Sequence, residues 1–106
     1  MKACVVIPVY NHEKAVAKVM ERLKPQGLPV FLVDDGSHAD CAKALAKIAK
    51  AKRGRHLITL SPNQGKGAAV LAGLRAAAEA GYTHALQLDA DGQHDSAYAG
   101  RFLSQG

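Results

Sequence analysis

The segment Ala3-Cys-Val-Val-Ile-Pro-Val9 is an unbroken apolar run near the start of a chain of 106 residues. Such a run predicts a β-strand that is buried on both faces, as the strands of parallel sheets are. The segments 28–33, 56–60 and 82–88 predict three further strands. The chain therefore has four predicted strands, and each is followed by a segment long enough for a helix.

The segments that follow the predicted strands carry helical signals. The first has apolar residues at i, i+3, i+4 and i+7, namely Val16, Val19, Met20 and Leu23, and the second repeats this spacing in Cys41, Ala44, Leu45 and Ile48. Asn11 is the predicted N-cap of the first helix, and Ser37 or Asp40 that of the second. A third helix is predicted over 66–80, and a last helix from Asp95 or Ser96 through Leu103.

This alternation predicts an α/β fold, with a mostly parallel, doubly wound sheet of about four βα units and right-handed crossovers. The length fits one domain or part of one. Hydrophobic residues make up 48% of the chain and charged residues 22%, a balance that argues against a disordered or fibrous protein.

Several classes of partner and location are disfavoured. No apolar run approaches the roughly 18 residues of a membrane span, and Asn11 ends the first run without a signal-peptide cleavage pattern. Cys4 and Cys41 lack metal-ligand spacing and predict reduced thiols in a cytoplasmic protein. The net charge is +5, and much of the excess lies within 43–55 without interleaved aromatic residues. We therefore expect a solvated basic face and no nucleic-acid partner.

Unusual polar clusters follow each predicted strand. They are Pro8-Val-Tyr-Asn11, Asp34-Asp-Gly-Ser37, Asn63-Gln-Gly-Lys-Gly67 and Asp89-Ala-Asp-Gly-Gln93. Open parallel sheets bind ligands beyond the carboxyl ends of their strands, near the switch in strand order. Convergence of the four clusters therefore predicts a ligand site at this edge.

Two acid pairs suggest the chemistry of that site. Asp89 and Asp91 can reach one point once the chain bends, and a divalent cation such as Mg²⁺ or Mn²⁺ would relieve their repulsion. The alternative is a surface turn that merely uses Asp and Gly. One of Asp34 and Asp35 is expected to face the cleft, where it suits a base N–H or ribose hydroxyls, while its neighbour fixes the loop. A turn with a helix cap is the alternative there.

The glycine-flanked Lys66 can offer its charge and helix N-terminal N–H groups to an anion, although Ala68 breaks the phosphate-loop pattern G-x-x-x-x-G-K-[ST]. A G-x-G-x-x-G fingerprint does not follow the first strand, which weighs against NAD. His94 is either a ligand near the acidic loop or an exposed loop histidine.

In order and spacing, four motifs resemble the family 2 glycosyltransferases, which have a GT-A nucleotide-sugar-binding fold. The motifs are Ile7-Pro-Val-Tyr-Asn11, Val33-Asp-Asp-Gly-Ser37, Asn63-Gln-Gly-Lys-Gly-Ala-Ala69 and Leu88-Asp-Ala-Asp-Gly-Gln-His94. The last is most similar to the polyprenyl-phosphate (dolichol-phosphate) sugar transferase branch.

The resemblance implies roles for matching positions. Pro8, Val9, Tyr10 and Asn11 would form the nucleotide pocket together with Asp35, Lys66 and Asp89. Asp35 would accept from the base N–H, and Lys66 would lie near the phosphates of a UDP- or GDP-sugar. Asp91 would be the main ligand of Mg²⁺ or Mn²⁺, with Asp89 and Gln93 assisting. The sugar would pass with inversion to a saccharide or lipid-phosphate acceptor.

The resemblance also implies an incomplete domain. Residues 1–106 would be the nucleotide-sugar-binding half of a GT-A domain, incomplete on its C-terminal side. No catalytic base is assignable, so the chain alone is expected to bind nucleotide without turnover. A longer parent protein could work at the cytoplasmic face of a membrane.

There are three alternatives to a glycosyltransferase. A metal-dependent nucleotidyltransferase would usually have a Gly-rich basic loop after the first strand, where this chain has Pro-Val-Tyr-Asn. A receiver-like signalling module would need an acidic pair there. A non-catalytic nucleotide-binding or interaction remnant stays open, and an exposed sheet edge would favour homo-oligomers.

Overall fold

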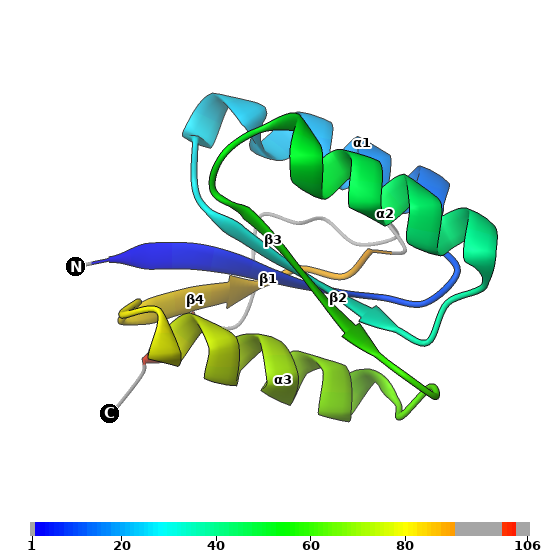
Figure 1. Cartoon of the computed structure of the whole chain (residues 1–106). Coiled ribbons are helices and arrows are strands. Elements are labelled where there is room, and N and C mark those ends of the chain that lie inside the picture. Colours follow the sequence, from blue (N-terminus) through cyan, green and yellow to red (C-terminus); the bar gives the residue numbers. More distant parts are fainter. Residues whose placement is uncertain (1, 91–100, 104–106) are drawn as a thin grey trace.

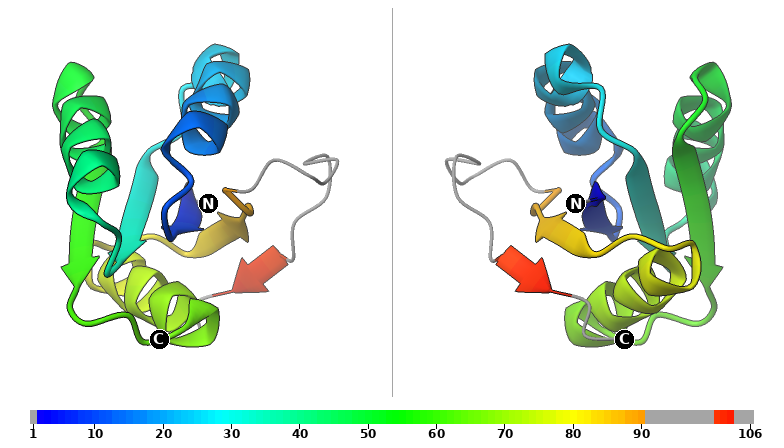
Figure 2. Two further views of the ribbon diagram at one scale, coloured as in Figure 1. Left: turned by 90° about the vertical axis from the view of Figure 1, so that its right-hand side faces the viewer. Right: turned by 90° about the vertical axis from the view of Figure 1, so that its left-hand side faces the viewer.

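The computed structural model describes residues 2–90 and the short strand at 101–103. It has an α/β fold with one five-stranded sheet and helices on both faces (Figures 1 and 2). In chain order the elements are β1 (Ala3–Val9), α1 (Glu13–Leu23), the 3₁₀ helix η1 (Lys24–Gln26), β2 (Val30–Asp35), α2 (Ala39–Ala51), β3 (Arg55–Leu60), α3 (Lys66–Glu79), β4 (His84–Gln87) and β5 (Arg101–Leu103).

The strand order in space is β3-β2-β1-β4-β5. The first four strands are parallel, and β1 lies between β2 and β4, so that Val5 pairs with Val30 on one side and with Leu86 on the other. The chain moves from β1 outward to β3 and then returns to place β4 on the opposite side of β1. The switch in strand order therefore lies between β1 and β4, where α/β sheets bind ligands.

Side chains of β1 alternate between two separate cores. Val5, Ile7 and Val9 belong to the core beneath α1 and α2, whereas Cys4 and Val6 belong to the core beneath α3. All five side chains are at most 1% exposed. The apolar run that opened the sequence is thus buried on both faces, as predicted.

The helix α3 packs closely on the sheet because small residues face it. Its buried residues are Ala69, Gly73 and Ala77. A Cβ atom built at Gly73 would lie 2.5 Å from Val6 Cγ1 and 3.0 Å from Val33 Cγ2, distances that real side-chain contacts avoid. The approach of α3 to β1 and β2 therefore depends on a glycine at this position.

One predicted element is wrong. The helix expected from Asp95 or Ser96 through Leu103 is contradicted at Arg101–Leu103, which form β5 antiparallel to β4; Asp95 and Ser96 lie outside the described residues. Since β4 would otherwise present unpaired backbone groups along its outer edge, pairing with β5 satisfies them. The other differences are shifts of one or two residues at element ends: the strand predicted at 28–33 is β2 at Val30–Asp35, and the strand predicted at 82–88 is β4 at His84–Gln87.

None of the helices in the described part of the chain combines the length and the apolar character that crossing a membrane would require.

Candidate functional site

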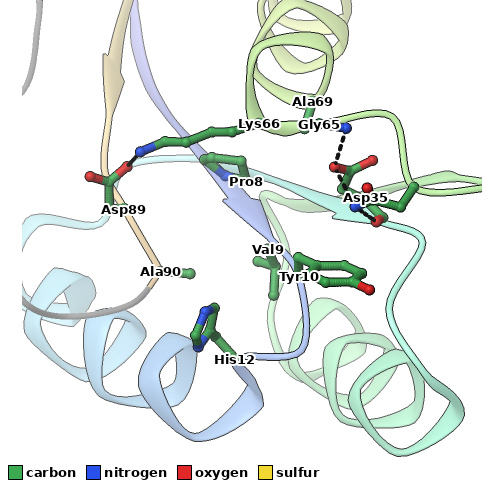
Figure 3. A pocket seen from close by; sticks show the side chains of 11 residues that line it. Pro8, Val9, Tyr10, His12, Asp35, Gly65, Lys66, Ala69, Asp89 and Ala90 are labelled. Carbon is green, nitrogen blue, oxygen red and sulfur yellow. Dashed lines mark hydrogen bonds and ion pairs between the residues drawn. The ribbon is translucent and has the colours of Figure 1, made fainter.

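A cavity of about 250 Å³ opens at the carboxyl ends of the parallel strands, at the switch between β1 and β4 (Figure 3). Its lining residues are Pro8, Val9, Tyr10, His12, Asp35, Asn63, Gly65, Lys66, Ala69, Asp89 and Ala90. They come from the ends of β1, β2 and β4, from the β3–α3 connection, from the first turn of α3 and from the residue before α1. The convergence predicted from the four polar clusters is therefore present.

Six of the residues predicted to bind nucleotide line this cavity. They are Pro8, Val9, Tyr10, Asp35, Lys66 and Asp89. The seventh, Asn11, lies outside the lining. Asp91, Gln93 and His94 fall outside the described residues, so their predicted roles stay predictions.

The end of β1 supplies an apolar wall. Pro8 and Val9 are buried, whereas Tyr10 is 47% exposed and its ring stands at the cavity (Figure 3). An exposed aromatic ring beside a buried apolar wall offers a surface on which a planar, partly polar ring can stack. This part of the site suits a heterocyclic base.

Asn11 acts as a bridge between loops and not as the predicted cap of α1. It has the left-handed φ of 58°, which Asn tolerates better than most residues. Its backbone N–H donates to Ser37 Oγ at 2.9 Å, and its Oδ1 accepts from the His38 N–H at 2.8 Å. These two bonds fasten the end of β1 to the loop after β2.

The N-cap residues of α1 and α2 are both histidines, so the caps predicted for these two helices are wrong. His12 is the N-cap residue of α1 and makes no side-chain capping bond. His38 is the N-cap of α2, in place of Ser37 or Asp40, and its Nδ1 accepts from the Cys41 N–H at 3.4 Å. The Ser37 hydroxyl and the Asn11 side-chain amide, which were predicted to cap α2 and α1, instead form hydrogen bonds between the loop after β1 and the loop after β2.

The adjacent acids Asp34 and Asp35 do different things. Both are buried, at 2% and 3% exposed. The carboxylate of Asp34 accepts from the Ser37 N–H at 2.9 Å and stabilises its own turn. Asp35 lines the cavity and reaches across to the β3–α3 loop, where it accepts hydrogen bonds from the Gln64 and Gly65 N–H groups.

An ion pair joins two sides of the cavity. Lys66, the first residue of α3, lies with Nζ 2.6 Å from Asp89 Oδ1 beyond the end of β4 (Figure 3). The Lys66 side chain is 58% exposed, so solvent screening limits the contribution to stability to about 1 kcal/mol at most. Its position matters more, because it places a cation and a carboxylate together at the mouth of the site.

Other lining residues were missed by sequence reasoning. His12 points into the cavity on the side of Ala90 (Figure 3). Asn63 and Gly65 also line it, whereas the sequence motif identifies them only as members of a loop. The available signal was position: His12 comes directly after the cluster that ends β1, at the edge of the sheet where ligands bind.

A second cavity of about 80 Å³ lies at the opposite, amino end of the strands. Four cationic side chains line it, those of Lys24, Lys52, Arg53 and Arg55. Lys24 and Lys52 are the C-cap residues of α1 and α2, where cations stabilise the helix dipole. Arg55 donates to the Ile48 carbonyl at 3.0 Å. Lys24, Lys52 and Arg55 therefore have a structural reason for their charges, in line with the expected solvated basic face.

The cysteines are not candidates for covalent chemistry. Burial raises the pKa of the Cys4 thiol. Burial also raises the pKa of Cys41, against a smaller opposing effect of its hydrogen bond with Ser37. A raised pKa lowers the fraction of reactive thiolate at neutral pH, so neither thiol is activated as a nucleophile.

Known proteins share this architecture. The fold superimposes with a TM-score of 0.72 on a mannosyltransferase from Pyrobaculum calidifontis, whose structure holds GDP-mannose and Mn²⁺. The two are 23% identical, and the match covers 85% of this chain and 27% of that one. This likeness shows the fold, which is GT-A.

Curated relatives extend the likeness to sequence. The UDP-N-acetylglucosamine–dolichyl-phosphate N-acetylglucosaminyltransferase of Methanococcus voltae is 30% identical, over 84% of this chain and 41% of its own length. The undecaprenyl-phosphate 4-deoxy-4-formamido-L-arabinose transferase of Proteus mirabilis is 35% identical, over 88% of this chain and 30% of its own. The chain thus spans less than half the length of these relatives.

The family model described as Glycosyl transferase family 2 matches residues 4–104. That range contains all the residues that line the cavity. It also contains every helix and strand described above, except for Ala3 at the start of β1. The chain belongs to glycosyl transferase family 2, and among its relatives are sugar transferases named for polyprenyl phosphates.

Proposed function

We propose that this chain is the donor-binding part of a glycosyltransferase and binds a nucleoside-diphosphate sugar in the 250 Å³ cavity. The observation that carries the proposal is the cavity itself. At the switch in strand order it brings together an apolar wall with an exposed aromatic ring, a buried carboxylate and a cation. These groups match a base, its N–H donor and a diphosphate, in that order.

Each end of the ligand would meet different residues. The base would lie against Pro8, Val9 and Tyr10, and Asp35 would accept from its N–H. The diphosphate would lie toward Lys66, where the ammonium group can exchange Asp89 for phosphate oxygens, which are strong acceptors of charged donors. The family relationship supports this orientation, and the nucleotide is proposed to be UDP or GDP because both occur in the names of the matched proteins.

The residues at the cavity fit a hard divalent cation that is completed by substrate. Asp89 provides carboxylate oxygens, the donor type that Mg²⁺ and Mn²⁺ prefer, and these ions commonly share phosphate oxygens with a few protein ligands. Within residues 2–90, no group of three or more His, Cys, Asp or Glu side chains could hold a metal alone. Asp91 and Gln93 are proposed as further ligands.

A bound divalent cation would neutralise the developing charge on the diphosphate leaving group. The chain's own contribution would be to hold the base and phosphates and to direct Lys66 at the same charge. In the complete protein, transfer is proposed to proceed with inversion to an acceptor. Polyprenyl phosphate is the acceptor class suggested by the names of two relatives, and a saccharide is the alternative. A cytoplasmic location, or the cytoplasmic face of a membrane for a longer parent, completes the proposal.

Titration calorimetry with UDP and GDP, each with and without Mn²⁺, tests the binding step. We expect one of the two to bind, and to bind more tightly with Mn²⁺. Asp91→Ala should remove the metal dependence while circular dichroism shows an unchanged fold. A folded chain that binds neither nucleotide would contradict the proposal and would favour a remnant that serves only interaction.

A further inference from the structure

Asp35 is the centre of a network that holds the loop before α3. Its Oδ1 accepts from the Gln64 N–H at 2.7 Å, and its Oδ2 accepts from the Gly65 N–H at 2.8 Å. Asn63 Nδ2 donates to both Oδ2 and the backbone carbonyl of Asp35, each at 2.9 Å. One buried side chain therefore fixes three successive residues that lie 28 to 30 positions away.

We propose that Asp35 is a positioning residue for the phosphate end of the site, in addition to any contact with the base. It acts by fixing Gly65, the N-cap of α3, and through it Lys66, which opens the helix. The inference rests on the proposed function, which places the diphosphate at Lys66. Asp35 would thereby couple the two ends of the nucleotide, the base and the diphosphate, through one carboxylate.

The N-terminus of α3 needs such a partner from elsewhere in the chain. Gly65 has no side chain and makes no capping bond of its own, and its φ of 102° lies outside the helical region. The first turn contains no acidic residue. The buried carboxylate of Asp35 helps with both needs, because it accepts the N–H of the N-cap residue Gly65 and opposes the positive end of the helix dipole.

The packing around Asp35 shows that the loop is held at close range. The next residue, Gly36, has a φ of 73°, and a Cβ atom there would lie 2.5 Å from the Asn63 backbone nitrogen. At Gly36 the loop after β2 therefore approaches the backbone of Asn63 so closely that no side chain fits between them. Small displacements of Asp35 are passed directly to Asn63, Gln64 and Gly65.

Holding the loop still leaves room for a base. A carboxylate offers about four acceptor positions, and the loop occupies three of those on Asp35. Asp35 also lines the cavity, so the remaining position is available to a ligand N–H on that side. Binding a base and fixing Lys66 are therefore compatible tasks for one side chain.

A ligand without a base separates the two roles. The probe is inorganic diphosphate with Mn²⁺, measured by calorimetry on the wild-type chain, Asp35→Asn and Asp34→Asn. The control variant Asp34→Asn makes the same change at an equally buried neighbour whose carboxylate accepts from Ser37 and not from the β3–α3 loop. Amide exchange at Gln64 and Gly65, followed by NMR without ligand, reports on the loop directly.

We expect Asp35→Asn to weaken diphosphate binding about tenfold or more, and to speed amide exchange at Gln64 and Gly65 by a similar factor, since charge-assisted bonds are lost. Asp34→Asn should change both by less than about threefold, because its bond lies within its own turn. If Asp35→Asn does not fold, Asn63→Ala removes two bonds of the same network without altering the acid, and should act in the same direction.

Two results would overturn the inference while leaving the proposed function standing. One is a wild type that binds nucleotide together with an Asp35→Asn variant whose diphosphate affinity and amide exchange are unchanged, which would confine Asp35 to the base. The other is an equal loss in Asp34→Asn, which would mean general destabilisation. A wild type that binds neither UDP nor GDP would instead sink the proposed function, and the phosphate role with it.

Discussion

The two ends of the parallel sheet use polar residues in opposite ways. At the carboxyl end, carboxylates and amides point inward between loops, and buried Asp34 and Asp35 take backbone N–H groups as partners. At the amino end, the cations Lys24, Lys52 and Arg53 are exposed around a cavity of about 80 Å³. The acids at the carboxyl end accept N–H groups, and a ligand can offer the same kind of donor. The cations at the amino end lie instead at the C-termini of α1 and α2.

The net charge of a region is therefore a poor guide to the presence of a ligand site. The amino end contains more cationic side chains, yet each of Lys24 and Lys52 follows the last residue of a helix, where a cation is favourable without any ligand. The charges at the carboxyl end are of both signs, are buried or paired, and lie at the switch in strand order. Burial and topology distinguish the two better than net charge does.

A methyl group added to one glycine at each end should have unequal effects. Gly36 and Gly27 both have positive φ, of 73° and 62°, but only Gly36 faces a close neighbour, the backbone of Asn63. Gly36→Ala should lower the free energy of unfolding by about 3 kcal/mol or more, because strain and overlap add. Gly27→Ala should cost about 1 to 2 kcal/mol from strain alone.

Urea unfolding of the two variants and the wild type measures both losses. Equal losses would break the comparison, since they would mean that the loops after β2 and β3 do not touch as described.

Removing one lysine charge at each end should separate binding from stability. Lys66→Gln should weaken binding of the nucleoside diphosphate about tenfold or more, since one bond between charged groups contributes about 1.5 to 3 kcal/mol. Lys52→Gln, with the same change in net charge, should leave the affinity unaltered. Calorimetry at two ionic strengths checks this, because a lysine acting at a phosphate should lose its advantage as salt rises. If both variants bound the nucleotide equally weakly, the role of Lys66 would be no more than general electrostatic attraction of the ligand to a basic protein.

The smallest expected effect is that of Lys52 on stability. If its charge serves the C-terminus of α2, Lys52→Gln should lower the free energy of unfolding by about 0.3 to 1 kcal/mol at low salt. The loss should shrink at high salt, and Lys43→Gln, on the exposed outer face within the same helix, should cost less. A larger loss for Lys43 would show that the amino end is not organised around helix termini.

Local patterns predicted most of the fold. The run at β1 was predicted with the observed bounds, and the four apolar positions of α1 are the four that are buried, because periodicity reports directly on which face packs. β5 was beyond such reasoning. Its pairing with β4 joins residues such as Leu86 and Arg101, and the unpaired edge that it covers exists only after the sheet has formed.

The residues of the site were easier to predict than their partners. Residue type and position after a strand were enough to select Asp35, Lys66 and Asp89, since the carboxyl ends of parallel strands meet at one edge. The partners of Asn11 and Asp35 lie 26 to 30 positions away, and they depend on how two loops pack. For the same reason His38 could not be identified as the cap of α2.

The alternation of β1 between two cores has a consequence for insertions and deletions. Removing or adding one residue within Ala3–Val9 would exchange the face of every following side chain in the strand. Side chains of the other core, such as the larger Ile7, would then be driven against α3, where Gly73 leaves room only for the present fit with Val6, and Tyr10 would turn away from the cavity. Variation in chain length should therefore accumulate in the connections at the amino end, such as 27–29, while β1 keeps a constant number of residues between its start and the cavity.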